Sequence, residues 1–332
     1  PGSNPESVTD SDMPFQVRRI SVHTSWLVLP LLARLPEIVR AERATHVLYA
    51  QWFPALAGIR LPREVKQVAI AHGRELLNHP LGRAGLFLSS PVLRRLDAIL
   101  PNSRATASLL PSGIHSGRIH VVHPGVDVSK LSPPSEEDLG TFRSRHRLSN
   151  DTPVVTTLAR LVPRKGIDTL IESMSLVRAA FPDARLLVGG SGPDLPRLKA
   201  MVDKADLTRS VQFVGRVPSE DMPSFFRAGV FALLSRQTAK DVEGFGMVLA
   251  EAQACGAPVL AARSGGMPEA VGKDAGIIVE PDSPNQAAQG LIRLFADPET
   301  RSAMGIEGRV FAESLSWEGR AEKVASILRG LT

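Results

Sequence analysis

Residues 241–256 read DVEGFGMVLAEAQACG and place two glutamates, Glu243 and Glu251, around the start of a strongly helix-forming run. Glycines before a helix let backbone N–H groups approach a ligand, and the positive helix end favours a bound phosphate. Glu251 is expected about two turns inside the helix, near the face that Glu243 approaches from the loop. This geometry suits a sugar nucleotide lying across a helix N-terminus. An amphipathic helix with solvated glutamates is the competing interpretation.

β-rich runs alternate with helix-forming segments along the whole chain. The strands expected in the first half are 16–22, 45–51, 66–72, 98–103 and 119–125. Those expected in the second half are 153–159, 184–190, 210–215, 230–235, 258–262 and 276–280. This alternation favours parallel sheets with crossover helices. We therefore predict an α/β protein of two Rossmann-like, doubly wound lobes with an interlobe cleft.

The composition of the chain suggests where these lobes begin and end. Residues 1–13 are polar and aperiodic and are expected to form a disordered tail. The first lobe is assigned to residues 14–148 and the second to 149–315, with a final helix at 316–332. The Pro-rich, polar segment 130–151 is predicted to be the linker between the lobes.

The charge is concentrated in the first lobe. Residues 14–130 hold fifteen Lys and Arg against six Asp and Glu, whereas residues 131–332 hold twenty-four against twenty-five. A basic lobe suits an anionic acceptor or an acidic membrane surface, and solubility alone is the competing explanation. Scattered arginines with almost no Tyr argue against nucleic acid. The single Cys255 and the lack of a visible signal segment favour a cytoplasmic protein.

Two cations follow the first strand expected in the second lobe. In ARLVPRKG, Arg160 and Lys165 are five positions apart, where they could clamp a diphosphate and stabilise a leaving phosphate. Solvated loop cations are the alternative, and we expect Arg164 to be one of them.

Glycines mark three other loops of the second lobe. Gly190 in VGGSGP could admit a nucleotide or form a tight turn, and Gly215 to Val217 could meet a base edge. In SGGMPE, the glycines allow a close backbone approach, while Glu269 fits either a ligand contact or an ordinary helix start. These alternatives stay open from the residues alone.

His72 follows a buried strand of the first lobe in the segment AHG and could face the cleft. A structural histidine is the alternative. The remaining histidines lack metal-ligand spacing, so we expect no metal site.

These segments together resemble the retaining glycosyltransferases of family 4, which have the GT-B fold. The matching segments occur in order as AHG, HPGVD, ARLVPRKG, VGGSGP, FVGRV, DVEGFGMVLAEAQACG and SGGMPE, within residues 70–332. DVEG, EAQACG and SGG-PE look most like the phosphatidylinositol mannosyltransferase branch, which uses GDP-mannose. The family's last helix crosses back to the first lobe, and 316–332 matches it.

The resemblance implies a role for each matching residue. Arg160 and Lys165 would hold the donor diphosphate, Glu251 the ribose hydroxyls, and Glu243 would lie beside the transferred sugar. His72 would lie near the anomeric side of that sugar and near the diphosphate. The implied contacts of the donor also include Gly190, Gly215, Val217, Gly244, Phe245, Gly246, Met247 and Val248.

The implied activity is hexosyl transfer with retention from GDP-mannose or a UDP-sugar to a glycan or lipid-linked acceptor. No cofactor or metal is expected, because cations and the helix end stabilise the leaving group. Peripheral contact with an anionic membrane would suit the basic first lobe.

One departure keeps other functions open. Family members begin with a strand, a Gly-rich loop and a helix, and here a polar tail and 16–22 stand in their place, so we expect a shortened first lobe. The alternatives are therefore a truncated or non-catalytic sugar-nucleotide-binding protein, and a GT-B sugar-nucleotide epimerase.

Overall fold

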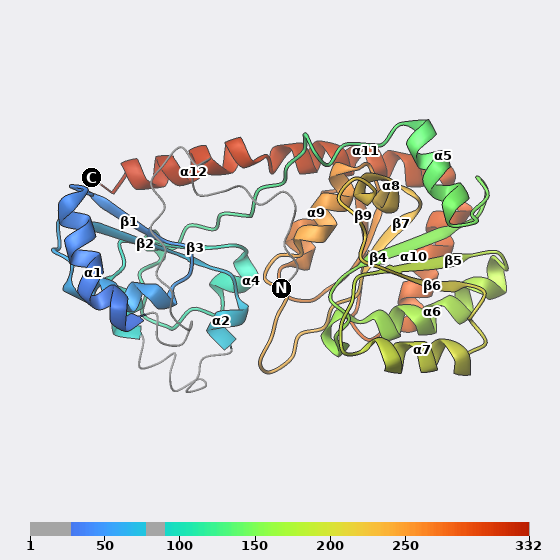
Figure 1. The fold of residues 1–332 in the computed structure, drawn as a ribbon, viewed down its shortest axis with the longest axis horizontal. Helices are drawn as coiled ribbons and strands as arrows, with labels where there is room; N and C mark the ends of the chain where they lie inside the picture. The colour runs from blue at the N-terminus through green and yellow to red at the C-terminus, as the bar shows by residue number, and fades with distance from the viewer. Residues whose placement is uncertain (1–27, 78–89, 332) are drawn as a thin grey trace.

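The computed structural model describes residues 28–77 and 90–331, which form two α/β lobes joined by a long helical crossing (Figure 1). The predicted tail 1–13 and the predicted strand 16–22 lie outside the described residues. The two-lobed, doubly wound α/β architecture predicted from the sequence is confirmed by the parallel sheets.

The first lobe is built on a parallel sheet whose described strands run in the order β1-β2-β3. Its centre is apolar, because Val68 of β2 lies opposite Leu48 on one side and Ala98 on the other. The described elements are α1 (Val28–Ala41), β1 (His46–Tyr49), η3 (Phe53–Arg60), β2 (Lys66–Ala71), α2 (Arg74–Leu77), β3 (Ala98–Pro101), α4 (Arg104–Ala107) and η4 (Ser116–Arg118).

The second lobe holds a parallel sheet whose six described strands run in the order β6-β5-β4-β7-β8-β9. Its elements up to α8 are α5 (Glu136–Arg145), β4 (Val154–Leu158), η5 (Pro163–Lys165), α6 (Ile167–Ala180), β5 (Arg185–Gly189), α7 (Leu195–Lys204), β6 (Val211–Gly215) and α8 (Met222–Arg227). The elements that follow are β7 (Val230–Leu233), α9 (Met247–Ala254), β8 (Val259–Ala262), η6 (Met267–Ala270), β9 (Gly276–Val279), α10 (Pro284–Ala296) and α11 (Pro298–Ser314).

The order of this second sheet locates its binding edge. From β4 the chain builds outward through β5 and β6, and it then returns to the other side of β4 to build β7, β8 and β9. Ligands of open α/β sheets bind beyond the carboxyl ends of the strands at such a reversal of strand order. The loops that follow β4 and β7 therefore flank the expected site, and they carry ARLVPRKG and DVEGFG.

The last helix, α12 (Trp317–Arg329), returns to the first lobe, as the family resemblance implies (Figure 1). Its apolar residues Val324, Ile327 and Leu328 pack on the buried core around Val68 and Ala98. These side chains are partly buried, so each contributes less than the about 1.5–3 kcal/mol of a fully buried one, and together they attach α12 to the first lobe.

The predicted linker and one predicted strand differ from the structure. Within 130–151, expected to be the linker between the lobes, α5 begins with the side chain of Ser135 accepting the N–H of Asp138, and its Phe142 is buried in the core of the second lobe. The prediction failed because polar, charged residues cover the exposed face of this helix. Residues 119–125 form no strand, and their one bridge pairs Ile119 with Ile99.

Candidate active site

The two glutamates of DVEGFGMVLAEAQACG line one cavity of about 410 Å³ between the lobes. Gly246 has φ of +94° and ends the loop before α9, a backbone conformation that other residues rarely adopt. Glu243 lies in the loop and Glu251 in α9, as the spacing predicted, but Glu251 lies just over one turn inside the helix instead of two. Gly244, Phe245, Met247 and Val248 also line this cavity.

Two cations of η5 converge on one oxygen of Glu243. Lys165 Nζ lies 2.5 Å from Glu243 Oε2, and Arg164 Nη1 lies 3.0 Å from the same oxygen. The hydroxyl of Ser235 donates to it as well, at 3.3 Å. Arg164 Nε also pairs with Asp241 at 3.0 Å. The site therefore carries a compact cluster of opposite charges directly before the N-terminus of α9.

The expectation that Arg164 is solvated is wrong. Only 17% of its side chain is exposed, because the single 3-10 turn of η5 directs both basic side chains inward. Gly166 makes this possible, since a Cβ there would lie 1.9 Å from the carbonyl oxygen of Leu234 at the end of β7. The loops after β4 and β7 are thus in backbone contact.

Arg160 lies apart from this cluster. Its side chain is exposed, makes no hydrogen bond or ion pair with a described residue, and is not among the residues that line the cavity. The structure thus brings Lys165 to Glu243 and leaves Arg160 outside. Its predicted contact with a diphosphate stays a prediction.

The two glutamates differ in their electrostatics. Burial opposes ionisation of Glu243, but the charges and hydrogen bonds of Lys165 and Arg164 outweigh burial and lower the pKa of its carboxyl. Burial alone raises the pKa of the Glu251 carboxyl. No described residue gives the carboxylate of Glu251 a hydrogen bond or an ion pair. Glu251 is thus free to accept hydrogen bonds from a ligand, whereas Glu243 is already paired.

His72 reaches the same cavity from the first lobe, at the carboxyl end of β2. Its Nε2 donates to the carbonyl oxygen of Ala50 at 2.8 Å, which leaves Nδ1 as the acceptor in the neutral ring. The backbone of His72 lies against Gly244, because a Cβ on Gly244 would lie 2.0 Å from the carbonyl oxygen of His72. The predicted position of His72 at the cleft agrees with the structure.

The glycines predicted to meet the nucleotide lie outside the cavity lining. Gly190 has φ of +110°, and a Cβ there would lie 1.9 Å from the carbonyl oxygen of Ala159, so it forms the close turn that was the alternative. Gly215 has open space around its Cα, and Val217 packs against the core of the second lobe. Contacts of Gly190, Gly215 and Val217 with a ligand remain predictions.

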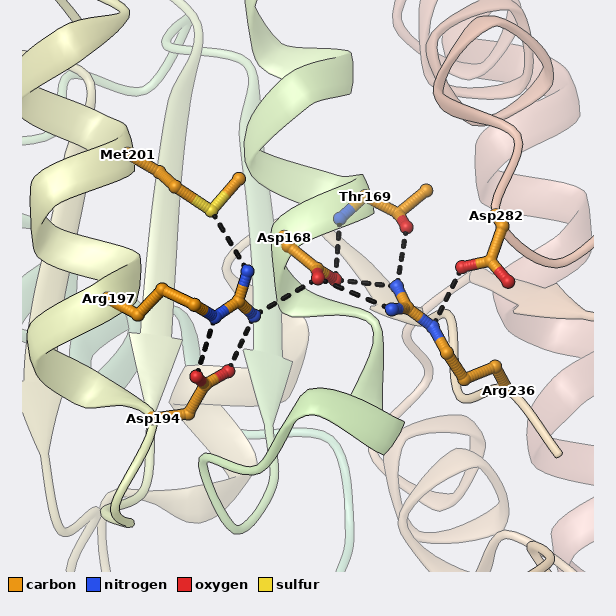
Figure 2. A network of polar contacts seen from close by, with 7 residues as sticks. All are labelled: Asp168, Thr169, Asp194, Arg197, Met201, Arg236 and Asp282. Carbon is orange, nitrogen blue, oxygen red and sulfur yellow. Dashed lines mark hydrogen bonds and ion pairs between the residues drawn. The ribbon is translucent and has the colours of Figure 1, made fainter. Parts of the chain in front are cut away.

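A network of charged residues that the sequence analysis missed supports the loops of the site (Figure 2). Asp168 at the start of α6 binds Arg236 at 2.6 Å and Arg197 at 3.1 Å. Arg197 also binds Asp194 at 2.7 Å, and Arg236 binds Asp282 at 2.7 Å. These residues come from the loops and helices that follow β4, β5, β7 and β9, so no local sequence pattern connects them.

This network reaches the cation cluster through the backbone. The N–H of Arg236 donates to the carbonyl oxygen of Arg164 at 2.8 Å. Burial opposes ionisation of Asp168, but the hydrogen bonds and charge of Arg236 outweigh burial and lower the pKa of its carboxyl. Asp168 is therefore linked through Arg236 to the backbone of Arg164.

Two absences hold for the described part of the chain. Across residues 28–77 and 90–331, no group of three or more His, Cys, Asp and Glu side chains could hold a metal ion. Within the same ranges, no helix is both long and apolar enough to cross a membrane.

Both halves of the chain match models of known protein families. Residues 140–311 match the family described as Glycosyl transferases group 1, and residues 5–130 match Glycosyltransferase Family 4. The match of the first half thus begins well before residue 70, where the resemblance was expected to start.

Curated relatives are similar over most of the chain. A GDP-mannose-dependent monoacylated alpha-(1-6)-phosphatidylinositol monomannoside mannosyltransferase of Corynebacterium glutamicum is 36% identical over 89% of this chain and 79% of its own. A GDP-mannose-dependent alpha-(1-6)-phosphatidylinositol monomannoside mannosyltransferase of Mycolicibacterium smegmatis is 34% identical over 94% of this chain and 84% of its own. The predicted similarity to this branch is confirmed.

Solved structures share the fold. HepE of Anabaena, solved with UDP and glucose, has a TM-score of 0.74 at 20% identity, and the match covers 94% of this chain and 84% of the HepE chain. Sucrose-phosphate synthase of Thermosynechococcus elongatus has a TM-score of 0.76 at 23% identity, over 94% and 80%. The GT-B fold predicted from the sequence is confirmed, and the chain belongs to the glycosyl transferases of group 1.

Proposed function

We propose that this glycosyltransferase moves mannose from GDP-mannose to a phosphatidylinositol-linked acceptor, with retention and without a metal ion. One observation carries the donor half of the proposal. Lys165, Arg164, the N-terminus of α9 and the carboxylate of Glu251 all face one cavity at the strand reversal of the second sheet. This set offers cations to a diphosphate and an acceptor to hydroxyl groups.

The cation cluster explains how the leaving group is stabilised. Cleavage of the sugar–phosphate bond leaves negative charge on the diphosphate, which Lys165 and Arg164 neutralise beside the positive end of α9. Arg160, from the loop after β4, is proposed to join them when the donor is bound. These groups supply the charge stabilisation that a divalent ion provides in other transferases.

The carboxylates take separate roles in this proposal. Glu251 accepts hydrogen bonds from the ribose hydroxyls, for which it has no competing partner among the described residues. Glu243, held by Lys165 at 2.5 Å, faces the transferred sugar from the loop before α9. His72 approaches the same sugar from the first lobe.

The choice of GDP-mannose and of the acceptor rests on the relatives. Those at 34–36% identity are GDP-mannose-dependent mannosyltransferases of phosphatidylinositol mannosides. The excess of Lys and Arg in residues 14–130 fits an acceptor in an anionic membrane surface and a peripheral cytoplasmic location.

Transfer of labelled mannose tests the proposal. The enzyme is incubated with GDP-[14C]mannose and vesicles that contain phosphatidylinositol mannoside, with UDP-glucose as the matched donor control. We expect labelled lipid only from GDP-mannose, unaffected by EDTA, with the α-linkage of the donor retained in the product. Donor binding without transfer would favour the non-catalytic alternative, and conversion of GDP-mannose without acceptor would favour an epimerase.

A further inference from the structure

Glu269 joins the two lobes through a contact that its sequence position does not suggest. It lies in η6 of the second lobe, yet its carboxylate accepts the backbone N–H groups of Arg104 at 2.9 Å and Ala105 at 3.1 Å. These two residues begin α4 of the first lobe. Glu269 therefore caps a helix of the opposite lobe, where a negative charge is favourable.

The same carboxylate also holds a residue of the chain segment that connects the lobes. His123 Nε2 donates to Glu269 Oε2 at 3.1 Å. Three residues later the chain that leaves the first lobe meets the chain that returns to it. The N–H of Val126 donates to the carbonyl oxygen of Leu315 at 2.8 Å, and Val126 forms an isolated β-bridge with Ser316. Glu269 is therefore linked to both the first lobe and the hinge between the lobes.

From His123 the contact continues to the loop that carries Glu243. The imidazole ring stacks on Phe245, with ring centroids 5.0 Å apart and planes at 26°. Phe245 is only 2% exposed and stands between Gly244 and Gly246, so its ring cannot shift without moving the loop. Glu269, His123 and Phe245 form one continuous contact, here called the interlobe clasp.

The lobes meet beside the interlobe clasp without room for side chains. A Cβ on Gly244 would lie 2.0 Å from the carbonyl oxygen of His72, and one on Gly266 would lie 2.9 Å from the hydroxyl oxygen of Ser103 in the first lobe. Two loops of the second lobe are thus in close contact with the first lobe. The interlobe clasp lies beside this contact, which brings His72 next to the loop that carries Glu243.

We propose that Glu269 is a positioning residue for sugar transfer, acting through the interlobe clasp to hold His72 against the donor loop. The inference rests on the proposed function, since it assigns transfer to the cavity that His72 and Glu243 share. Lys165, Glu243 and Glu251 all belong to the second lobe, so nucleotide binding does not need the contact between Glu269 and the first lobe. Transfer does need it, because a displacement of about 1 Å at the reacting groups costs about 10²-fold in rate.

The kinetic test separates binding from turnover. Glu269→Ala is expected to lower kcat with GDP-mannose by roughly 10- to 100-fold while the Kd for GDP stays within about twofold. Glu269→Gln keeps an oxygen that accepts from α4 and should restore part of kcat. His123→Ala should lower kcat in the same direction, and the double variant should lose less than the product of the two single losses, because both act in one contact. The matched control is Glu313→Ala, which removes an exposed carboxylate of the second lobe.

A spectroscopic test reports on the lobes without turnover. Spin labels are attached to Glu64→Cys in the first lobe and Lys204→Cys in the second, which are both exposed, while the native Cys255 is buried. The distance distribution of the native clasp should be narrow, and Glu269→Ala should broaden it toward longer distances.

The outcomes decide the proposal in either direction. Loss of kcat with retained GDP affinity and a broadened distance distribution supports it. An unchanged distance distribution overturns it, and so does an equal loss of GDP affinity and kcat, which would mean local damage to the donor loop. If the native enzyme transfers no mannose from GDP-mannose, the proposed function fails while the spin-label distances still decide whether the clasp holds the lobes.

Discussion

The pairing of Glu243 with two cations makes Glu243→Gln the sharpest test of the site. In the absence of a ligand, the Glu243 carboxylate neutralises Lys165 at 2.5 Å and Arg164 at 3.0 Å, and only 17% of its side chain is exposed. The amide keeps the shape and one oxygen acceptor but removes the negative charge. Two neighbouring cations are then left without their shared partner.

The expected loss of stability follows from these contacts. Removing one partner of a buried ion pair costs about 3–5 kcal/mol. The amide oxygen recovers part of this, because a hydrogen bond to a charged group contributes about 1.5–3 kcal/mol. We expect a net loss of about 1.5–2 kcal/mol, which for a lobe of this size lowers Tm by roughly 3–8 °C.

Adding GDP should reverse much of this loss. The diphosphate supplies the negative charge that the variant lacks, so Glu243→Gln should bind GDP more tightly than the native protein does. At one saturating GDP concentration the variant then gains about 1.4 kcal/mol more stability than the native protein for each tenfold difference in Kd. The difference in Tm between native protein and Glu243→Gln should therefore shrink when GDP is saturating. Thermal unfolding with and without GDP measures this, with Glu280→Gln as the matched control, because its ion pair with Arg263 is exposed.

Two results would refute the reasoning. If Glu243→Gln melts within about 2 °C of the native protein, a shift worth roughly 1 kcal/mol or less, the cation cluster is not held by this carboxylate. If GDP leaves the difference in Tm unchanged or widens it, the diphosphate does not bind beside Lys165 and Arg164.

Four further expectations can be measured on the same protein. Because the pKa of Glu243 is lowered on folding, its contribution to stability is present above its ordinary pKa of 4.5 and is lost as pH falls through the folded value, so the Tm difference from Glu243→Gln should close in acid. Glu251→Gln should raise Tm at pH 8, where burial of the charged carboxyl is unfavourable, and should weaken GDP binding by about tenfold in calorimetry; unchanged affinity would remove Glu251 from the site. His72→Ala should lower transfer by at least about tenfold with GDP affinity retained, and equal losses would contradict its role. Asp168→Asn should destabilise the protein by about 2–4 kcal/mol in urea unfolding and weaken GDP binding, because Arg236 then releases the backbone of Arg164; full GDP affinity would show that the network does not support the site.

Local patterns were sufficient for most of the fold. Alternating apolar runs predicted β4 to β9 within a residue or two, because buried parallel strands are continuously apolar and their helices carry clear periodicity. They failed at α5, whose polar surface hides the buried Phe142, and at 119–125, which makes one isolated bridge and two backbone hydrogen bonds to β3 without forming a strand. In both places the tertiary partner decided the structure.

The sequence alone predicted which loops line the cavity, since DVEGFG and PRKG each follow an expected strand, and it predicted the family through the order of its motifs. The tertiary structure decided which side chains meet. It turned Arg164 and Lys165 of η5 inward onto Glu243 and left Arg160, which precedes η5, exposed. It also brought the carboxylate of Glu269 in the second lobe to the N-terminus of α4 in the first lobe. Contacts between residues far apart in the chain depend on packing and lobe placement, for which local sequence has no signal.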